Sequence, residues 1–215
     1  MKTPVRFTLA EPTLILGVGI SGSGKSTMLK PLAEMLSDAV FIEKDLVNDI
    51  FLRTYDRTGP REDMLRYAEY HRVPRDNPKN TYYRDHVLFQ SYAFMLEYAK
   101  QLLSMGKHPI LEGNYIKEIR WGYIEQVLRP QLEGANYKLK LLLTHSPADI
   151  IRQRLIARAA ERDRIKLSND EEWKKLIAEQ PPIPPEIEKY PHIKVDTTGP
   201  LTEQRLFDVI AFLAS

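Results

Sequence analysis

The chain has 215 residues, of which 43% are hydrophobic and 28% are charged, as is ordinary for a globular protein of one domain with or without a small mobile insertion. The formal net charge of +2 gives no global electrostatic reason to bind nucleic acid or a membrane surface. There is no cysteine, which excludes disulfides, zinc–thiolate sites and a cysteine nucleophile.

The N-terminal segment has no targeting or membrane-spanning pattern. Residues 1–12 carry Lys2, Arg6 and Glu11 and contain no long apolar stretch. The apolar run 14–18 is far too short to span a bilayer and leads directly into glycines. We therefore expect no membrane association and a cytoplasmic location.

The first predicted elements are a buried strand and a helix. Residues 13–18 form a short apolar run between Pro12 and a glycine-rich turn, which is typical of a strand covered on both faces. Downstream, apolar residues recur at helical spacing: Met28, Leu29, Leu32, Met35 and Leu36. The sequence thus predicts a strand, a tight loop and an amphipathic helix.

The loop, residues 19–26, is a complete Walker A pattern, Gly-x-x-x-x-Gly-Lys-Ser. Its glycines let backbone N–H groups approach phosphates, and the following helix N-terminus adds a partial positive charge. Lys25 supplies a cation for the β- and γ-phosphates, and Ser26 offers its hydroxyl to Mg²⁺. The alternative, an ordinary glycine-rich turn, is disfavoured by the strand-before-helix context. The residues predicted to bind ATP here are Gly22, Ser23, Gly24, Lys25, Ser26 and Thr27.

A second strand and a long helix flank an irregular polar stretch. Residues 39–42 predict the strand, and periodic apolar residues over 92–103 predict the helix, with Gly106 as its C-terminal stop. Between them, residues 46 to about 80 are polar, aromatic and arginine-rich, and prolines interrupt them. We interpret 46–90 as a helical insertion that covers the substrate.

Strands and helices then continue to alternate. Residues 109–113 and 139–144 predict two strands, separated by a helix over 121–128 that Pro130 closes. This order indicates parallel strands joined by crossover helices.

The C-terminal third completes the pattern. Residues 146–149, Ser-Pro-Ala-Asp, are a helix-start signature, and we expect that helix to run through Arg164. Residues 181–185 are a proline-rich loop, 193–196 a fifth strand and 206–213 a closing helix. The predicted fold class is α/β, a three-layer P-loop NTPase whose five-stranded parallel sheet has helices on both faces.

An arginine row is the second distinctive feature. Arg154, Arg158 and Arg162 are spaced by four and share one face of the predicted helix. Like charges at this spacing cost roughly 0.2–0.5 kcal/mol per pair, a cost that a bound anion would remove. Guanidinium groups suit phosphate oxygens and also stack on adenine. The alternative is a solvated surface face, with Glu161 pairing locally.

The layout resembles the nucleoside-monophosphate-kinase-like group. It is most similar to the small kinases of zeta-toxin, chloramphenicol-phosphotransferase and polynucleotide-kinase-like type. The resemblance covers nearly the whole chain and is specific at the Walker A pattern, at the aspartate after the second strand and at the arginine helix. It implies one P-loop kinase domain over 1–215, with 46–90 as the substrate insertion, a lid at about 154–180, and ATP and Mg²⁺ as cofactors.

By this resemblance, Asp45 accepts the proton of the substrate hydroxyl. A carboxylate at the carboxyl end of a buried strand, near the γ-phosphate, can orient and deprotonate an alcohol. The alternative is that Asp45 only caps the next helix. Related kinases often carry an arginine a few residues later, where this chain has Asp49 and Ile50 and where Arg53 is the nearest arginine. That departure leaves the identity of the acceptor open.

Glu112 stands at the end of the third strand, in the place of a Walker B acidic residue. Aspartate is commoner there in the family, but a glutamate can hold a Mg²⁺-bound water or a substrate hydroxyl. The alternative is a satisfied polar residue at a strand end. Asn114 and Tyr115 follow directly and are expected to line the same cleft and to bind substrate.

The same resemblance assigns the arginines and the loop after the fifth strand. Arg154 matches a base-stacking arginine and Arg158 a phosphate-binding arginine. Arg162 and Arg164 are lid candidates that steady charge on the transferring phosphoryl group. Thr198 lies where related kinases pack a loop against adenine, although a plain turn is equally consistent. The residues assigned to catalysis are Lys25, Asp45, Arg158 and Arg162.

The leading functional prediction is an ATP-dependent phosphotransferase that moves the γ-phosphate to a hydroxyl of a small molecule. One alternative is a 5′-hydroxyl polynucleotide kinase, although the near-zero net charge disfavours an extended nucleic-acid track. Another is a nucleotide switch or P-loop ATPase that acts through a protein partner. The absence of an Asn-Lys-x-Asp guanine signature disfavours a GTPase switch. The acceptor and the oligomeric state stay open.

Overall fold

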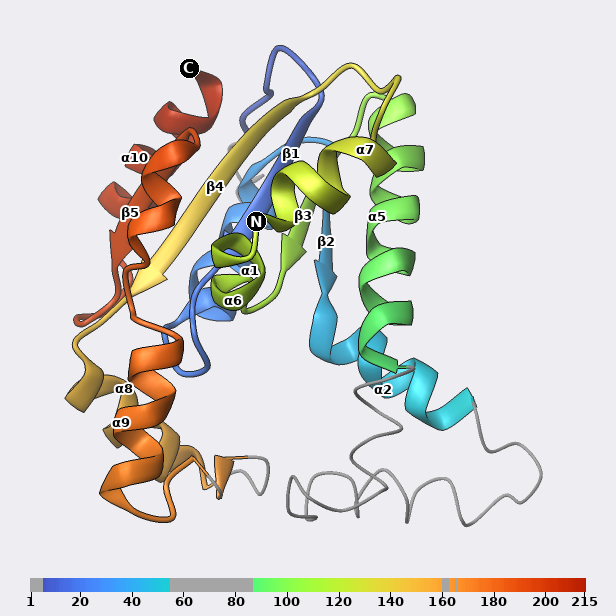
Figure 1. Ribbon diagram of the computed structural model, residues 1–215. Helices are drawn as coiled ribbons and strands as arrows, with labels where there is room; N and C mark the ends of the chain where they lie inside the picture. Colours follow the sequence, from blue (N-terminus) through green and yellow to red (C-terminus); the bar gives the residue numbers. More distant parts are fainter. Residues whose placement is uncertain (1–5, 55–86, 160–162, 165) are drawn as a thin grey trace.

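The sheet has five strands, all parallel, in the order β2-β3-β1-β4-β5 (Figure 1). The computed structural model describes residues 6–54, 87–159, 163–164 and 166–215. The strands are β1 (Thr13–Val18), β2 (Ala39–Glu43), β3 (His108–Glu112), β4 (Lys138–His145) and β5 (His192–Asp196). All five lie where the sequence predicted strands, and the α/β fold with a five-stranded parallel sheet is confirmed.

The central strand β1 is buried along its whole length. Its side chains alternate, because Leu14 and Leu16 enter the core on one face of the sheet and Ile15 enters the core on the other. The neighbouring β3 divides in the same way, with Leu111 on the first face and Ile110 on the second. An unbroken apolar run is therefore stable as a strand here, because helices remove both of its faces from water.

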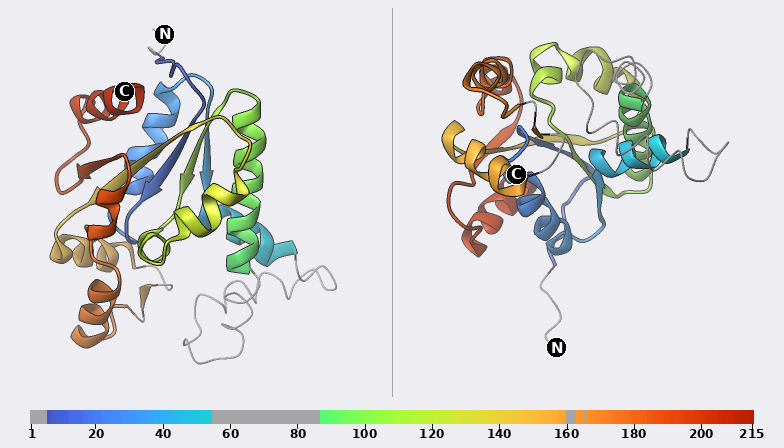
Figure 2. Two further views of the ribbon diagram at one scale, coloured as in Figure 1. Left: turned by 45° about the horizontal axis from the view of Figure 1, so that its top comes forward. Right: turned by 90° about the horizontal axis from the view of Figure 1, so that it is seen from below.

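Helices cover both faces of the sheet and complete three layers, as the two views of Figure 2 show. On one face lie α1 (Lys25–Met35) and α10 (Glu203–Ala214). On the other lie α5 (Leu88–Ser104), α6 (Ile116–Arg120) and the π-helical turn η2 (Ile124–Leu128). Each of these helices contributes buried apolar residues to one of the two cores that sandwich the sheet.

Three further helices gather beyond the carboxyl edge of the sheet (Figure 1). One is α2 (Lys44–Thr54), which follows β2 directly. The others are α8 (Ala148–Arg158) and α9 (Asp170–Glu179), which follow β4. A short 3-10 turn, η4 (Pro185–Lys189), then leads into β5. The edge at which ligands bind in open parallel sheets is thus the edge where these helices crowd.

The helix α8 is shorter than the sequence predicted. It ends at Arg158, and Ala159 follows in the left-handed conformation with φ 49°. The expected continuation through Arg164 is therefore wrong. Along α8 only Ile151 and Leu155 are buried, and Ile156 is exposed, so the helix has no buried apolar residue after Leu155 that holds it against the core.

Two local predictions also need correction. Ser146 does not cap α8: Pro147 is the residue before the first turn, and the Ser146 hydroxyl instead pairs with the Thr197 hydroxyl at 2.9 Å. Pro130 does not close a helix, because it lies in the first turn of α7 (Arg129–Gln131), which continues from η2. Proline is tolerated in a first turn, where the N–H it lacks would have no helical partner.

The predicted insertion, 46–90, lies largely outside the described residues, which exclude 55–86. Its two ends are described and belong to α2 and α5, where the rings of Phe51 and Phe94 meet edge to face with centroids 5.9 Å apart. None of the helices in the described part of the chain combines the length and the apolar composition of a membrane span.

Candidate active site

The Walker A loop bends sharply between β1 and α1. Gly19 has φ +150°, and a Cβ there would lie 2.4 Å from the Ser23 hydroxyl and 2.6 Å from the Thr144 carbonyl oxygen. Gly24, just before the first turn of α1, has φ 84° and offers no capping side chain. The first backbone N–H groups of α1 are thereby left to an outside acceptor, and no acidic residue lies in that first turn. This is the arrangement of an anion site at a helix N-terminus.

Contacts from three other segments hold the loop in this shape. The Ser23 hydroxyl pairs with that of Thr144 on β4 at 2.8 Å. The Gly19 N–H donates to the Asn114 carbonyl oxygen, 3.0 Å away, from the segment after β3. From the segment after β5, the Thr197 hydroxyl donates to the Ser23 carbonyl oxygen at 2.7 Å. The loop is therefore braced before any ligand arrives.

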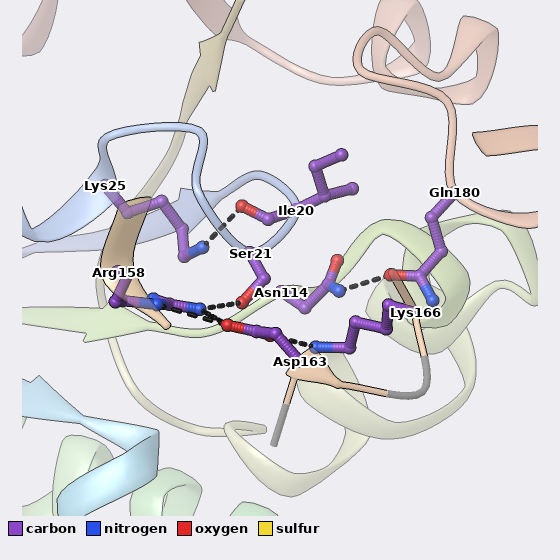
Figure 3. Close-up of polar contacts among 8 residues, drawn as sticks. All are labelled: Ile20, Ser21, Lys25, Asn114, Arg158, Asp163, Lys166 and Gln180. Atoms are coloured by element: carbon purple, nitrogen blue, oxygen red, sulfur yellow. Dashed lines mark hydrogen bonds and ion pairs between the residues drawn. The ribbon is translucent and has the colours of Figure 1, made fainter. Parts of the chain in front are cut away.

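The Lys25 ammonium lies inside the loop. It donates to the carbonyl oxygens of Gly19 at 2.7 Å and Ile20 at 3.1 Å, the second of which Figure 3 shows. Burial lowers the pKa of Lys25 to about 8, although the charges of Glu112 and Asp45 oppose the shift. An approaching polyphosphate would favour the charged form of this lysine.

Ser26 and Glu112 meet across the sheet edge. The Ser26 hydroxyl donates to Glu112 Oε1 at 2.7 Å. The other carboxylate oxygen, Oε2, is buried and has no hydrogen-bond partner among the described residues. Burial raises the pKa of Glu112, against the hydrogen bond from Ser26 and the charge of Lys25. A buried acceptor beside a hydroxyl oxygen is a donor set that suits Mg²⁺, which takes one or two carboxylates together with phosphate oxygens and water.

Asp45 lies in the first turn of α2, where β2 ends. It is exposed, and its charge raises the pKa of both Lys25 and Glu112, so the three groups share one electrostatic neighbourhood. The preceding Lys44 packs against α5, with its ammonium 4.5 Å from the centroid of the Tyr92 ring. The start of α2 thus presents Asp45 toward the Walker A loop side of the sheet edge.

Asn114 and Tyr115 both make contacts within the protein. Asn114 forms a hydrogen bond, and Tyr115 packs against other rings. The Asn114 amide donates to the side-chain oxygen of Gln180, which ties the segment after β3 to the end of α9. Tyr115 is completely buried with φ 54°, and its ring lies against those of Tyr92 and Tyr123, with centroids 5.4 and 5.9 Å away. Tyr115 is therefore part of the hydrophobic core in this structure, and its contact with a substrate stays a prediction.

Arg154 joins the Walker A loop to the segments that follow β4 and β5. Its guanidinium donates to the Gly22 carbonyl oxygen at 3.3 Å and to the Ser146 hydroxyl at 3.2 Å. It also donates to the carbonyl oxygens of Thr197 and, at 3.3 Å, of Thr198. The predicted base-stacking arginine thus lies beside Thr198, which the sequence placed at the same adenine site.

Arg158, at the end of α8, reaches the Walker A loop. It donates to the Ser21 hydroxyl at 3.2 Å and forms an ion pair with Asp163, whose other oxygen accepts from Lys166 at 2.9 Å. Figure 3 shows this chain of contacts beside Lys25. Arg162 lies outside the described residues, so its predicted role stays a prediction. Arg154 and Arg158 do share the face that the four-residue spacing predicted.

Sequence reasoning missed Thr197, Asp163 and Lys166. The sequence predicts a role for Thr198, whose hydroxyl donates to Asp196 Oδ1 at 2.6 Å, while the hydroxyl of the neighbouring Thr197 braces the Walker A loop. A small hollow opens beside them, lined by Gly24, Thr27, Met28, Val195, Asp196, Thr197, Leu201 and Arg205. The only sequence signal for Asp163 and Lys166 was their place among the lid arginines.

Solved structures share this fold. A candidate kinase from Chloroflexus aurantiacus superposes with a TM-score of 0.61 at 18% identity, over 94% of this chain and 93% of that one. A sugar kinase from a Janibacter species superposes with a TM-score of 0.52 at 17% identity, over 98% and 95% of the two chains. At these identities the likeness shows a shared fold, and not the reaction.

The amino-acid sequence also resembles known proteins. A calmodulin calcium-dependent NAD kinase from Arabidopsis thaliana is 36% identical over 77 residues, which are 32% of this chain and 14% of that protein. The matched part is thus about a seventh of the relative's length. The model of the AAA domain family matches residues 14–183, a span that includes the Walker A loop, Asp45, Glu112 and the arginine helix. Since this span is well over half of the 215 residues, the chain belongs to the AAA domain family.

Proposed function

We propose that this protein is an ATP-dependent phosphotransferase that moves the γ-phosphate of ATP to a hydroxyl group of a small molecule. The observation that carries the proposal is the meeting of Lys25, the Ser26–Glu112 pair and Asp45 at one end of the sheet. A cation, a metal-binding pair and an exposed carboxylate are the groups that phosphoryl transfer to an alcohol requires.

The Walker A loop would hold the polyphosphate of ATP. The backbone N–H groups at the start of α1 face the phosphates, and Lys25 turns from the loop carbonyls toward the β- and γ-phosphate oxygens. Ser26 and Glu112 are the residues that would hold Mg²⁺, which would supply positive charge to offset that of the phosphates. Arg154, beside Thr198, would cover the adenine, and Arg158 and Arg162 would offset charge on the transferring group.

Asp45 would act as the base. The acceptor oxygen attacks the γ-phosphorus, the bond from that phosphorus to the β–γ bridging oxygen breaks, and ADP leaves. The hydroxyl proton passes to the Asp45 carboxylate, which is exposed and so reachable by a substrate. Residues 46–90 would supply the rest of the acceptor pocket, and about 154–180 the lid, within one domain over 1–215.

The acceptor can be sought with a phosphate-transfer panel. The purified chain is incubated with Mg²⁺, γ-labelled ATP and sugars, antibiotics, nucleosides, NAD or 5′-hydroxyl oligonucleotides. NAD is included because of the name of the Arabidopsis relative. Slow ATP hydrolysis that one alcohol strongly stimulates supports the proposal. Stimulation by oligonucleotides alone indicates a polynucleotide kinase, and stimulation by a protein partner but by no acceptor rejects the kinase assignment.

The variant Asp45→Asn tests the proposed base. We expect transfer to the best acceptor to fall by about 10²- to 10⁴-fold, because general-base catalysis contributes that much. The affinity for ATP should change less than the rate of transfer, since the hydrogen bonds that hold the Walker A loop and Lys25 do not involve Asp45. Asp208→Asn, an exposed aspartate on α10, is the matched control and should keep near-normal transfer. Full transfer by Asp45→Asn would show that another group takes the proton.

A further inference from the structure

Asp163 is a completely buried carboxylate held between two cations. Its Oδ2 accepts from Nε of Arg158 at 3.2 Å and from Nη2 of the same guanidinium. Its Oδ1 accepts from the Lys166 ammonium at 2.9 Å. Burial by itself raises the pKa of Asp163, but the charges and hydrogen bonds of Lys166 and Arg158 outweigh it and lower the pKa. The carboxylate is therefore charged at neutral pH.

This cluster lies against the Walker A loop. Arg158 donates to the Ser21 hydroxyl at 3.2 Å, a contact between residues 137 positions apart. Lys166 is close enough for its positive charge to lower the pKa of Lys25, as Arg158 also does. Figure 3 shows Lys25, Arg158 and Lys166 converging from the Walker A loop, the end of α8 and the segment before α9. Three cations thus face one region.

The cluster around Asp163 carries a net positive charge. Arg158 and Lys166 both contact Asp163, whose single negative charge neutralises only one of these two cations. Lys166 uses one of its three N–H donors on Asp163, and its side chain is 23% exposed. Arg158 is 37% exposed, so both cations keep a face toward solvent while their carboxylate partner is buried. A shared buried carboxylate that leaves two cations accessible orients them toward a second anion.

We propose that Lys166 is a third cationic contact, with Lys25 and Arg158, for the terminal phosphate of a bound nucleoside triphosphate, and that Asp163 is the positioning residue that holds Lys166 and Arg158 there. This inference rests on the proposed nucleotide site. It adds a residue outside the Walker A pattern and outside the arginine row. A merely structural ion pair would stabilise the chain segment but would not distinguish ATP from ADP.

The first test compares triphosphate and diphosphate binding. Dissociation constants for Mg²⁺-ATP and Mg²⁺-ADP are measured by calorimetry for the wild type, Lys166→Ala, Lys166→Arg and Lys175→Ala. Lys175 is an exposed lysine on α9 and serves as the control. We expect Lys166→Ala to weaken ATP binding about tenfold, as the loss of one charge-assisted contact implies. ADP binding should change much less, Lys166→Arg should restore most of the affinity for ATP, and Lys175→Ala should match the wild type.

The second test addresses Asp163. The variant Asp163→Asn keeps the shape of the side chain and removes its charge, so it should weaken ATP binding about as much as Lys166→Ala. The double variant Asp163→Asn/Lys166→Ala should lose little further ATP affinity, because each single change already disrupts the same Asp163–Lys166 contact. Unchanged or tighter ATP binding by a folded Asp163→Asn protein would overturn its positioning role. If Asp163→Asn does not fold, the pair Lys166→Ala and Lys166→Arg decides the proposal alone.

The outcomes separate this inference from the proposed function. A wild-type protein that binds neither nucleotide contradicts the nucleotide site itself. A wild type that binds ATP, beside a Lys166→Ala variant that binds ATP equally well or loses ATP and ADP affinity in parallel, overturns only the role of Lys166.

Discussion

Burial shifts the pKa values of two ionisable side chains at this edge of the sheet. The pKa of Lys25 falls to about 8 and that of Glu112 rises, in each case chiefly because water is excluded from the charged group. Both groups would regain favourable interactions from a ligand, Lys25 from phosphate oxygens and Glu112 from a divalent cation. Shifted values of this kind concentrate at functional sites.

The lowered pKa of Lys25 predicts that ATP binding takes up protons. The free protein is about half deprotonated at this residue at pH 8, whereas bound phosphates raise the pKa and favour the ammonium. Calorimetry at pH 8 in two buffers of different ionisation enthalpy should therefore give uptake of about half a proton per ATP. At pH 6.5 the lysine is already charged, and this uptake should vanish. The affinity should fall as the pH rises above about 8, and equal enthalpies in both buffers at pH 8 would contradict the prediction.

Among the helices, α8 contacts several parts of the site that are distant in the sequence. Through Arg154 it binds the Walker A loop and the segment after β5, and through Arg158 it reaches Ser21. It also contacts α9, since Arg152 forms an ion pair with Asp170 at 2.6 Å. The helix is short and contributes only two buried residues, so these polar contacts fix its position as much as its apolar face does.

The variant Arg154→Lys tests this joining role. A single ammonium cannot reproduce the planar fork that reaches Gly22, Ser146 and Thr197 together. We expect the free energy of unfolding to fall by about 1–2 kcal/mol and ATP binding to weaken. Arg129→Lys, at an exposed position on α7, is the control and should leave both quantities near their wild-type values. Thermal melting and calorimetry measure the two effects, and equal behaviour of the two variants would refute the role.

At the scale of the whole molecule, the parallel sheet brings the ends of separate strands to one edge. The register aligns Gly17 with Glu112 and Glu43 with Glu112, so β1, β2 and β3 end side by side. The Walker A loop, Asp45 and Glu112 follow or close these three strands. Residues separated by many positions in the chain thus form one site because the strands all run in the same direction.

Ligand binding at this edge should stabilise the whole fold. Mg²⁺-ATP at 100 times its dissociation constant should add about 2.7 kcal/mol to the free energy of unfolding. For a chain of this size that corresponds to a rise of about 5–10 °C in the melting temperature. Differential scanning fluorimetry with ATP, GTP and AMP measures the shift, and we expect the largest rise with ATP. Equal melting temperatures with and without triphosphates would contradict nucleotide binding.

The strands and the Walker A loop were predictable from the sequence because their causes are local. A buried parallel strand needs a short apolar run, and the tight turn at Gly19 and Gly24 needs residues without a Cβ. The length of α8 was not predictable from arginine spacing, because a helix ends where its apolar contacts with the core end. The burial of Tyr115 likewise depends on α5 and η2, which bring Tyr92 and the neighbouring Tyr123 to its ring.

The sequence by itself determined the order of strands and helices, the Walker A loop and the acidic residues at two strand ends, since each of these features depends on residues close together in the chain. Only the tertiary structure decided that Asp163 and Lys166 belong beside Ser21 and Lys25. In the sequence they are ordinary charged residues among others. Their pairing depends on the burial of one carboxylate between α8 and the Walker A loop, and burial is a property of the folded chain.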